Sequence, residues 1–341
     1  MALNLVHFGD VHFPGALRGW RPRDLLGKKL VGLVSVKLTG RGRTFRDANA
    51  IVEAMFAEIR SNPPDAILFS GDATMLALPA EFANAAARLH VNDPTLPPGF
   101  AVPGNHDYYT RHAGLAGGFE RVFAPWQVGE RVDGHHYPFA RRIGPVWLVG
   151  VNSSYPRFGL GSSGTIGAEQ LSRFRTLCAR LSPGPRILVT HYPLRDAHGQ
   201  LERANHRLRD HADALATAVD CGISLWVHGH IHRPFVLPPG TEIPFPVICA
   251  GSATQARRWA YNRYRIDGWQ LAMTRRVYDP TAREFRDEST RDMTLLQTGD
   301  RANLRRSGSN IRLVNKRTIA IVIFPEPPLA AVSNHADPHR N

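Results

Sequence analysis

Cysteine, lysine and long apolar runs are all scarce in this chain of 341 residues. The three cysteines, Cys178, Cys221 and Cys249, include no CxxC pair, which favours reduced thiols over a disulfide framework. The apolar stretches, such as residues 319–324, are far shorter than the roughly 20 residues that a membrane-spanning helix needs. A basic n-region and a small-residue cleavage site are also lacking near the N-terminus. We therefore expect a cytoplasmic protein, neither secreted nor membrane-spanning.

Acidic residues are also few relative to basic ones. Lys+Arg is 42 and Asp+Glu is 29, which gives a formal net charge of +13 with neutral histidine. Almost all of this excess is arginine, so it has two explanations that composition leaves open. One is a bias in genome composition, and the other is attraction to an anionic partner such as a phosphate substrate, nucleic acid or an acidic membrane. With 43% hydrophobic and 21% charged residues, a wholly disordered chain is excluded.

Short β-branched or aromatic runs, bounded by Gly, Pro, Asn or Asp, predict strands. They cover residues 3–8, 66–70, 99–102, 146–151, 186–190 and 223–227. Helical spacing of apolar residues predicts helices at 46–61, 79–89, 167–181 and 203–219, and further strands are expected at 244–250, 261–266 and 269–277. Strands that alternate with helices indicate an α/β fold, and the last strands indicate antiparallel additions to the sheets.

Polar motifs follow five of these apolar runs directly. They are Asp10-x-His12, Gly71-Asp72, Gly104-Asn105-His106-Asp107, His191 and Gly229-His230-x-His232. Each motif alone has an ordinary explanation, because an aspartate at a strand end is usually a turn former. Together they are different, because loops at the carboxyl ends of the strands deliver their side chains to one crevice. Carboxylate, imidazole and amide groups without cysteine suit a hard or borderline divalent metal, and seven candidate ligands suit two ions that share a carboxylate.

This ordered set resembles the DxH, GD, GNHD/E, H and GHxH pattern of the calcineurin-like metallophosphoesterases. The resemblance implies an α/β fold, a four-layer αββα sandwich of two mixed β-sheets flanked by helices. It implies a catalytic domain over residues 1–280, with a basic insert at about 15–46. Residues 281–341 are then expected to form a C-terminal extension that is partly irregular or disordered.

The same resemblance assigns roles by motif position. It implies one metal bound by Asp10, His12 and His232, a bridging Asp72, and a second metal bound by Asn105, His191 and His230. It also implies that His106 contacts the phosphate and protonates the leaving oxygen, and that Asp107 orients His106. The cofactors would be two divalent ions (Mn, Fe or Zn) that hold a bridging hydroxide in line with phosphorus.

The substrate is less constrained by these motifs. A phosphodiesterase of the cyclic-nucleotide or general type is the first expectation. The basic segment 15–46 resembles a segment of bacterial metallophosphoesterases that act on UDP-diacylglucosamine, so a pyrophosphatase peripheral on the inner face of the membrane is the alternative. Two observations count against this alternative. The segment has a weak helical pattern with Gly27 and Gly32, so a solvated basic loop is the other interpretation of it. His106 also stands where the best-known lipid A branch has arginine.

Three tyrosines follow the metal motifs, and two non-enzymatic functions need consideration. Tyr108, Tyr109 and Tyr192 either contact substrate or pack at the base of a loop. A scaffold that has lost its ligands is disfavoured, because every ligand position is filled. A stable nucleic-acid partner is not expected, because no aromatic-interleaved basic motif or zinc-finger spacing occurs.

Overall fold

The computed structural model describes residues 2–13, 41–155 and 161–297. Most of the predicted basic insert at 15–46 lies outside the described residues, and so does the predicted membrane contact through it. The part of the predicted extension from residue 298 to 341 lies outside them as well.

Two mixed sheets form the centre of the described fold. The strands of the first sheet are β1 (Leu3–Phe8), β2 (Ala66–Phe69), β3 (Gly99–Ala101), β11 (Ala260–Asp267), β12 (Gln270–Asp279) and β13 (Glu284–Thr294), in the order β13-β12-β11-β1-β2-β3. Those of the second sheet are β4 (Glu130–Arg131), β5 (Phe139–Ile143), β6 (Val146–Gly150), β7 (Arg186–Val189), β8 (Leu225–His228), β9 (Phe235–Leu237) and β10 (Val247–Cys249), in the order β4-β5-β6-β7-β8-β10-β9.

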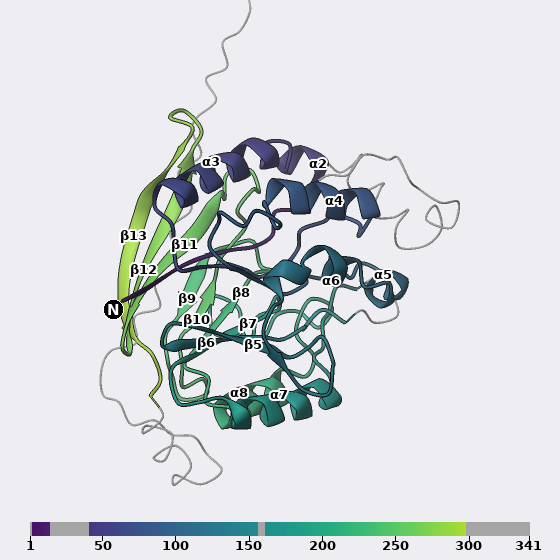
Figure 1. The fold of residues 1–341 in the computed structure, drawn as a ribbon, viewed down its shortest axis with the longest axis vertical. Helices are drawn as coiled ribbons and strands as arrows, with labels where there is room; N and C mark the ends of the chain where they lie inside the picture. The colour runs from purple at the N-terminus through teal and green to yellow at the C-terminus, as the bar shows by residue number, and fades with distance from the viewer. Residues whose placement is uncertain (1, 14–40, 156–160, 298–341) are drawn as a thin grey trace, which may run out of the picture.

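Helices cover the outer face of each sheet (Figure 1). The described helices are α2 (Arg41–Thr44), α3 (Ala48–Ser61), α4 (Pro79–Arg88), α5 (Arg111–Leu115), α6 (Gly118–Val122), the 3-10 helix η2 (Ala124–Trp126), α7 (Ala168–Arg180) and α8 (His211–Asp220). Helices α3, α4 and α6 pack on the first sheet, and α7 and α8 pack on the second. The layers therefore run helix, sheet, sheet, helix, as the resemblance implied.

Period-two alternation along the strands explains why both sheet faces are buried. In β1, Leu3 and Leu5 face the second sheet, whereas Val6 and Phe8 face the layer of α3 and α4. The same alternation recurs in the other central strands, so one apolar core fills the space between the sheets and two more lie beneath the helices. Burying a large apolar side chain contributes about 1.5–3 kcal/mol, so these three cores dominate the stability of the fold.

Parallel pairing explains why distant motifs meet. Strands β1, β2 and β3 are parallel neighbours, and so are β6, β7, β8 and β10. Their carboxyl ends therefore lie at the same edge of each sheet, and the loops that follow carry the predicted ligands.

The predicted strands and helices are present, with some differences at their ends. Helix α8 begins at His211 rather than near residue 203, because residues 203–209 form a turn that pairs with residues 162–164. Strand β13 was not predicted, because its sequence, EFRDESTRDMT, is mostly polar and pairs on one side only, with β12. The first sheet therefore continues past residue 280 with β13. Among the described helices, none has the length and apolar character needed to cross a membrane.

Candidate metal centre

Most of the predicted ligands lie on strained backbone. Left-handed φ angles, which side-chain-bearing residues seldom adopt, occur at Asp10 (55°), His12 (44°), Asp72 (61°), His230 (72°) and His232 (58°). Such conformations cost free energy and persist where the surrounding structure holds them, most often at functional sites. All three loops that carry these motifs therefore contain strained backbone.

Backbone hydrogen bonds and tight glycine contacts hold these loops together. The Asp10 N–H donates to the Gly71 carbonyl at 2.9 Å, and the His12 N–H donates to the Asp72 carbonyl at 3.0 Å. Gly104 passes so close to Asp72 that a Cβ atom at Gly104 would lie 2.0 Å from Asp72 Oδ1. Glycine in the GNHD motif therefore allows the second and third loops to approach each other.

The first donor cluster consists of Asp10, His12, Asp72 and His232. The Nε2 atoms of His12 and His232 lie 3.0 Å apart, and His232 Nε2 lies 3.1 Å from Asp10 Oδ1. His12 Nδ1 lies 3.2 Å from the Thr74 carbonyl, and His232 Nδ1 lies 2.5 Å from Gln255 Oε1. Because each Nδ1–H can only donate to these oxygens, both Nε2 lone pairs face each other in the neutral tautomers. A cation between them relieves this repulsion, so the donor set fits a metal ion.

The second donor cluster consists of Asn105, His191 and His230, with Asp72 at its border. Asn105 Oδ1 lies 3.0 Å from His191 Nε2 and 2.9 Å from His230 Nδ1. The other ring nitrogens face carbonyl groups, His191 Nδ1 that of Ser70 at 2.8 Å and His230 Nε2 that of His206 at 3.0 Å. Donor atoms thus converge here in the same way as in the first cluster.

Asp72 lies between the two clusters, as expected of a bridging ligand. Its Oδ2 atom is 3.6 Å from His12 Nε2 and 3.4 Å from His191 Nε2. Burial opposes the charge of the Asp72 carboxylate, but His191 and His106 outweigh burial and hold its pKa well below the usual range. Burial likewise opposes the charge of His191, and Asp72 outweighs it and raises the pKa of His191 to about 9. The buried carboxylate therefore favours positive charge on either side of it.

The profile of the calcineurin-like phosphoesterases matches residues 3–234. The chain belongs to the calcineurin-like phosphoesterase family. It is therefore a hydrolase of phosphoester bonds, and the family uses a dinuclear divalent metal centre. The predicted family and the predicted sandwich fold are both confirmed.

Solved structures share the fold of this phosphoesterase at low sequence identity. A dimetal phosphatase from Danio rerio is 11% identical with a TM-score of 0.57, over 86% of this chain and 99% of that one. A purple acid phosphatase from yellow lupin seeds is 12% identical with a TM-score of 0.56, over 89% of this chain and 55% of that one. GAP50, the anchor in the inner membrane complex of Plasmodium, is 11% identical with a TM-score of 0.52, over 94% and 98%. No curated protein matches this phosphoesterase.

His106 lies beside the first cluster of the phosphoesterase. Its ring centroid is 4.8 Å from that of His12, and its backbone N–H donates to Asp72 Oδ1 at 2.7 Å. Its Nδ1 atom lies 2.6 Å from the Met75 carbonyl. This carbonyl holds the His106 ring through Nδ1.

Asp107 lies between two of the ligand loops. Its carboxylate accepts backbone N–H groups from both the second and the third ligand loop, those of Asp72 (2.9 Å), Ala73 (3.3 Å), Thr74 (3.0 Å) and Gly104 (2.9 Å). Burial and the neighbouring Asp72 charge raise the pKa of Asp107 to about 7, against the opposing effect of these backbone hydrogen bonds. Asp107 therefore joins two ligand loops, and its expected role in orienting His106 stays a prediction.

The three tyrosines contact protein groups of the phosphoesterase. The Tyr108 hydroxyl donates to Glu120 Oε1 at 2.6 Å, and the Tyr192 hydroxyl donates to the Ser162 carbonyl. The Tyr192 ring also packs on His230, with centroids 4.2 Å apart. Tyr109 is buried with its ring 5.4 Å from that of His106. These contacts favour packing over substrate binding for Tyr108 and Tyr192, and substrate contact by Tyr109 stays a prediction.

Sequence reasoning missed the residues that orient the first cluster. Gln255 contacts His232, and the Ser252 hydroxyl donates to the Asp10 carbonyl at 2.7 Å. Both follow β10. Ser252 stands close behind this apolar run, as the ligands do, whereas Gln255 lies further along the chain and carries no such signal. Thr74 contributes its carbonyl, for which the sequence holds no signal.

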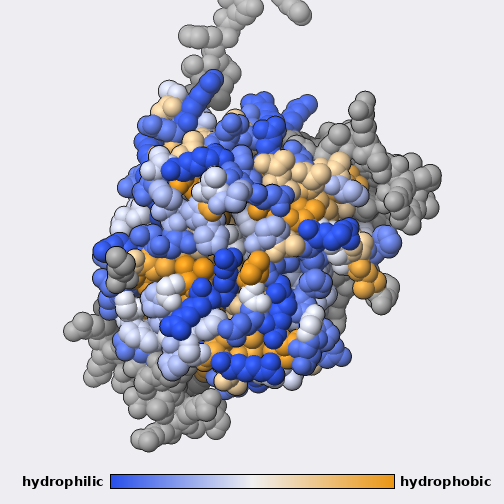
Figure 2. All heavy atoms as spheres, in the orientation of Figure 1, coloured by the Kyte–Doolittle hydropathy of each residue, from blue (hydrophilic) through white to orange (hydrophobic). Residues whose placement is uncertain are grey.

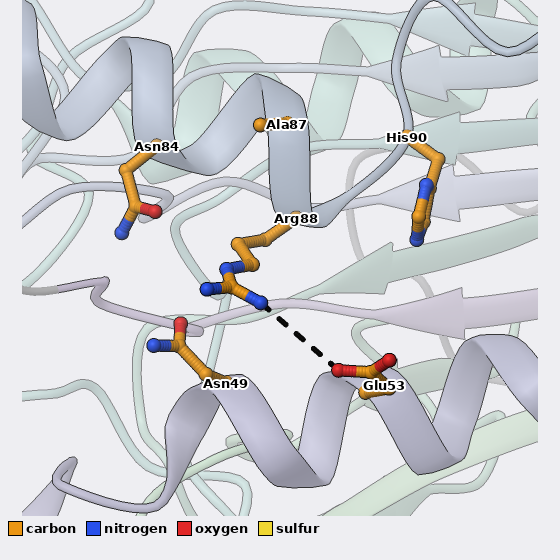
Figure 3. A pocket seen from close by; sticks show the side chains of 6 residues that line it. All are labelled: Asn49, Glu53, Asn84, Ala87, Arg88 and His90. Carbon is orange, nitrogen blue, oxygen red and sulfur yellow. Dashed lines mark ion pairs between the residues drawn. The ribbon is translucent and has the colours of Figure 1, made fainter.

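Two surface grooves lie away from these ligands. The first, of about 290 Å³ between α3 and α4, is lined by Asn49, Glu53, Asn84, Ala87, Arg88 and His90 (Figure 3). Arg88 reaches towards Glu53 there, with 4.0 Å between the charged atoms. The second lies on α8 beside Leu215 and Val219. Figure 2 shows hydrophobic patches over α4 and over α7 and α8, on a face that is otherwise mainly hydrophilic. No predicted ligand lines either groove, so neither is assigned to the metal centre.

Proposed function

We propose that this phosphoesterase is a metal-dependent phosphodiesterase. The observation that carries the proposal is the position of Asp72 between two donor clusters, with His106 beside the first. Two bound divalent ions would lower the pKa of a water molecule and stabilise charge on the phosphoryl oxygens. Asp10, His12, Asp72 and His232 would hold one ion, and Asp72, Asn105, His191 and His230 the other.

His106 would supply the proton donor that a poor leaving oxygen requires. Because the Nδ1–H of His106 donates to the Met75 carbonyl, Nε2 holds a proton for the departing ester oxygen only when the ring is an imidazolium, and His106 would act in that doubly protonated form. The Met75 contact fixes the ring orientation, so the donor is in place before the substrate binds. An alkoxide leaving group of a diester benefits from such a donor more than a nitrophenolate does.

The test compares esters side by side on manganese-loaded protein. We expect hydrolysis of bis(p-nitrophenyl) phosphate, a diester, to exceed that of p-nitrophenyl phosphate, a monoester. Preference for the monoester would contradict the proposal. The His106→Ala variant serves as control, and its loss should be larger for 3′,5′-cyclic AMP than for the nitrophenyl diester.

The natural substrate class requires a second pair of compounds. Cleavage of 3′,5′-cyclic AMP alone would support a cyclic-nucleotide phosphodiesterase. Cleavage of UDP-diacylglucosamine in detergent micelles alone would support the membrane-surface pyrophosphatase. In that case liposome flotation of a variant that lacks residues 15–46 tests whether the basic segment binds membrane.

All three cysteines are buried thiols rather than disulfides, which supports a cytoplasmic location. We infer an anionic phosphoester as substrate and no stable nucleic-acid partner. Cell fractionation tests the location, and a strong salt-dependent affinity for DNA without hydrolysis would contradict the inference about nucleic acid.

A further inference from the structure

Two short loops border the second donor cluster on its outer side. The Ser162 N–H donates to the Asn205 carbonyl at 2.9 Å, and the Gly164 N–H donates to the Arg207 carbonyl at 3.2 Å. This pairing places His206 beside His230, with 6.2 Å between their ring centroids. His206 follows no strand, so no sequence pattern marks it.

His206 takes part in this site through two separate groups. Its main-chain carbonyl accepts the Nε2–H of His230 at 3.0 Å and so helps to orient a predicted ligand. Its side chain is exposed, and its Nδ1 atom lies 3.0 Å from the Ser162 hydroxyl. Within the described residues, no hydrogen-bond partner lies at His206 Nε2. When Nδ1 accepts from Ser162, Nε2 carries a hydrogen that is available to a ligand.

The ring of His206 is held in place by residues that are themselves anchored. Ser162 is fixed by its backbone bond to Asn205, and its carbonyl accepts the Tyr192 hydroxyl. The Tyr192 ring in turn packs against His230. The exposed imidazole is therefore coupled to the second cluster through a short chain of contacts.

The direction of His230 decides which part of a substrate His206 reaches. His230 presents Nδ1 to the second cluster and Nε2 to His206, so His206 lies one ring further from the metal ligands. A group at that position would meet a substituent of a bound ester rather than its phosphoryl oxygens. Two arginines of the same turn, the exposed Arg203 and the half-buried Arg207, add positive charge there. An anionic substituent is the chemistry that this border favours.

We propose that His206 is a specificity-determining residue that recognises a second anionic group, such as a second phosphate, on the phosphodiester substrate. The inference rests on the proposed phosphodiesterase function and adds a substrate class to it. Arg203 assists by electrostatic attraction, and Ser162 positions the ring. One hydrogen bond to a charged group at an exposed site corresponds to a preference of about tenfold.

Two chromogenic diesters that differ in one phosphate test this proposal. They are thymidine 5′-(p-nitrophenyl phosphate) and its 3′-phosphorylated form, and both release p-nitrophenol. For the manganese-loaded protein we expect kcat/KM to be about tenfold higher for the phosphorylated compound. His206→Ala should reduce this ratio to between one and two, and His206→Gln, which retains a donor, should restore part of it.

The controls separate recognition from a structural role. His135, an exposed histidine between β4 and β5, provides the matched control His135→Ala, which should leave the ratio unchanged. If His206 were only structural, His206→Ala would lower kcat/KM equally for both diesters and reduce bound metal. Equal kcat/KM values for the two diesters in the unmodified protein, or an unchanged ratio in His206→Ala, would overturn this inference but not the proposed function. Failure to cleave either diester would overturn the proposed function and this inference with it.

Discussion

Gly104→Ala should disrupt the metal centre through a single methyl group. An ideal Cβ at Gly104 would lie 2.0 Å from Asp72 Oδ1 and 2.4 Å from the Asp72 backbone nitrogen. An ordinary contact requires at least about 3.2 Å between such atoms, so Asp72 must move by more than about 1 Å. Metal–ligand distances tolerate only about 0.2 Å, so the bridging position cannot survive the shift.

The expected magnitudes follow from these distances. Affinity for the divalent ions should fall by at least about 100-fold. This loss is larger than the one expected when only a residue that is hydrogen-bonded to a ligand is changed. Overpacking should also lower the free energy of unfolding by about 1–3 kcal/mol, or the Tm by about 2–10 °C. Manganese titration and metal analysis measure the first effect, and a thermal melt in chelator measures the second.

Gly240→Ala is the matched control for this experiment. A Cβ at Gly240 meets nothing within 4 Å, so this variant should bind metal and melt as the unmodified protein does. If Gly104→Ala bound two equivalents of manganese with unchanged affinity, the argument that Gly104 allows Asp72 to bridge would be wrong.

Three other perturbations have defined outcomes. Asp72→Ala should lose bound metal and activity together, whereas His106→Ala should keep bound metal and lose turnover, as metal analysis beside a diester assay will measure. Gln255→Ala should weaken binding of one ion by about 10–100-fold because His232 loses its orienting partner, and a manganese titration in two unequal steps would reveal it. Burial, with the nearby positive charges of His228 and Arg275, lowers the pKa of His7 to about 3 from its ordinary 6.5. Between pH 6.5 and 3 the His7 side chain is protonated in the unfolded chain but not in the folded one. The free energy of unfolding is therefore fully retained above pH 6.5 and falls below it, by about 3 kcal/mol at pH 4.5. His7→Asn should remove that part of the slope in urea titrations at pH 7.5 and 4.5 with chelator present, and an unchanged slope would contradict the pKa shift.

The ligands could be predicted because they depend on local patterns. Short continuous apolar runs predict buried strands, and Asp10, Asp72 and His191 closely follow such runs. Parallel strands place their carboxyl ends at one edge, so the sequence alone determined that these side chains would meet. The family pattern then assigned them to two metal positions.

The contacts that support the ligands could not be predicted, because they join segments far apart in the chain. Ser252 contacts the Asp10 carbonyl across 242 positions, and Asp107 contacts the Asp72 backbone across 35. Their partners are mainly backbone groups, which every residue carries and which leave no mark in the sequence. Strand β13 likewise depends on pairing with β12 rather than on its own mostly polar residues.

The sequence by itself therefore determined the chemistry of this phosphoesterase: the types of ligand, their order and the sheet edge at which they gather. Only the tertiary structure decided which nitrogen each histidine presents, because a ring's orientation follows from the oxygen that its second nitrogen faces. It also decided that Asp107 joins two ligand loops and that His206 borders the second cluster. These assignments depend on distances between loops, which the folded packing of the two sheets sets and the spacing of residues along the chain does not.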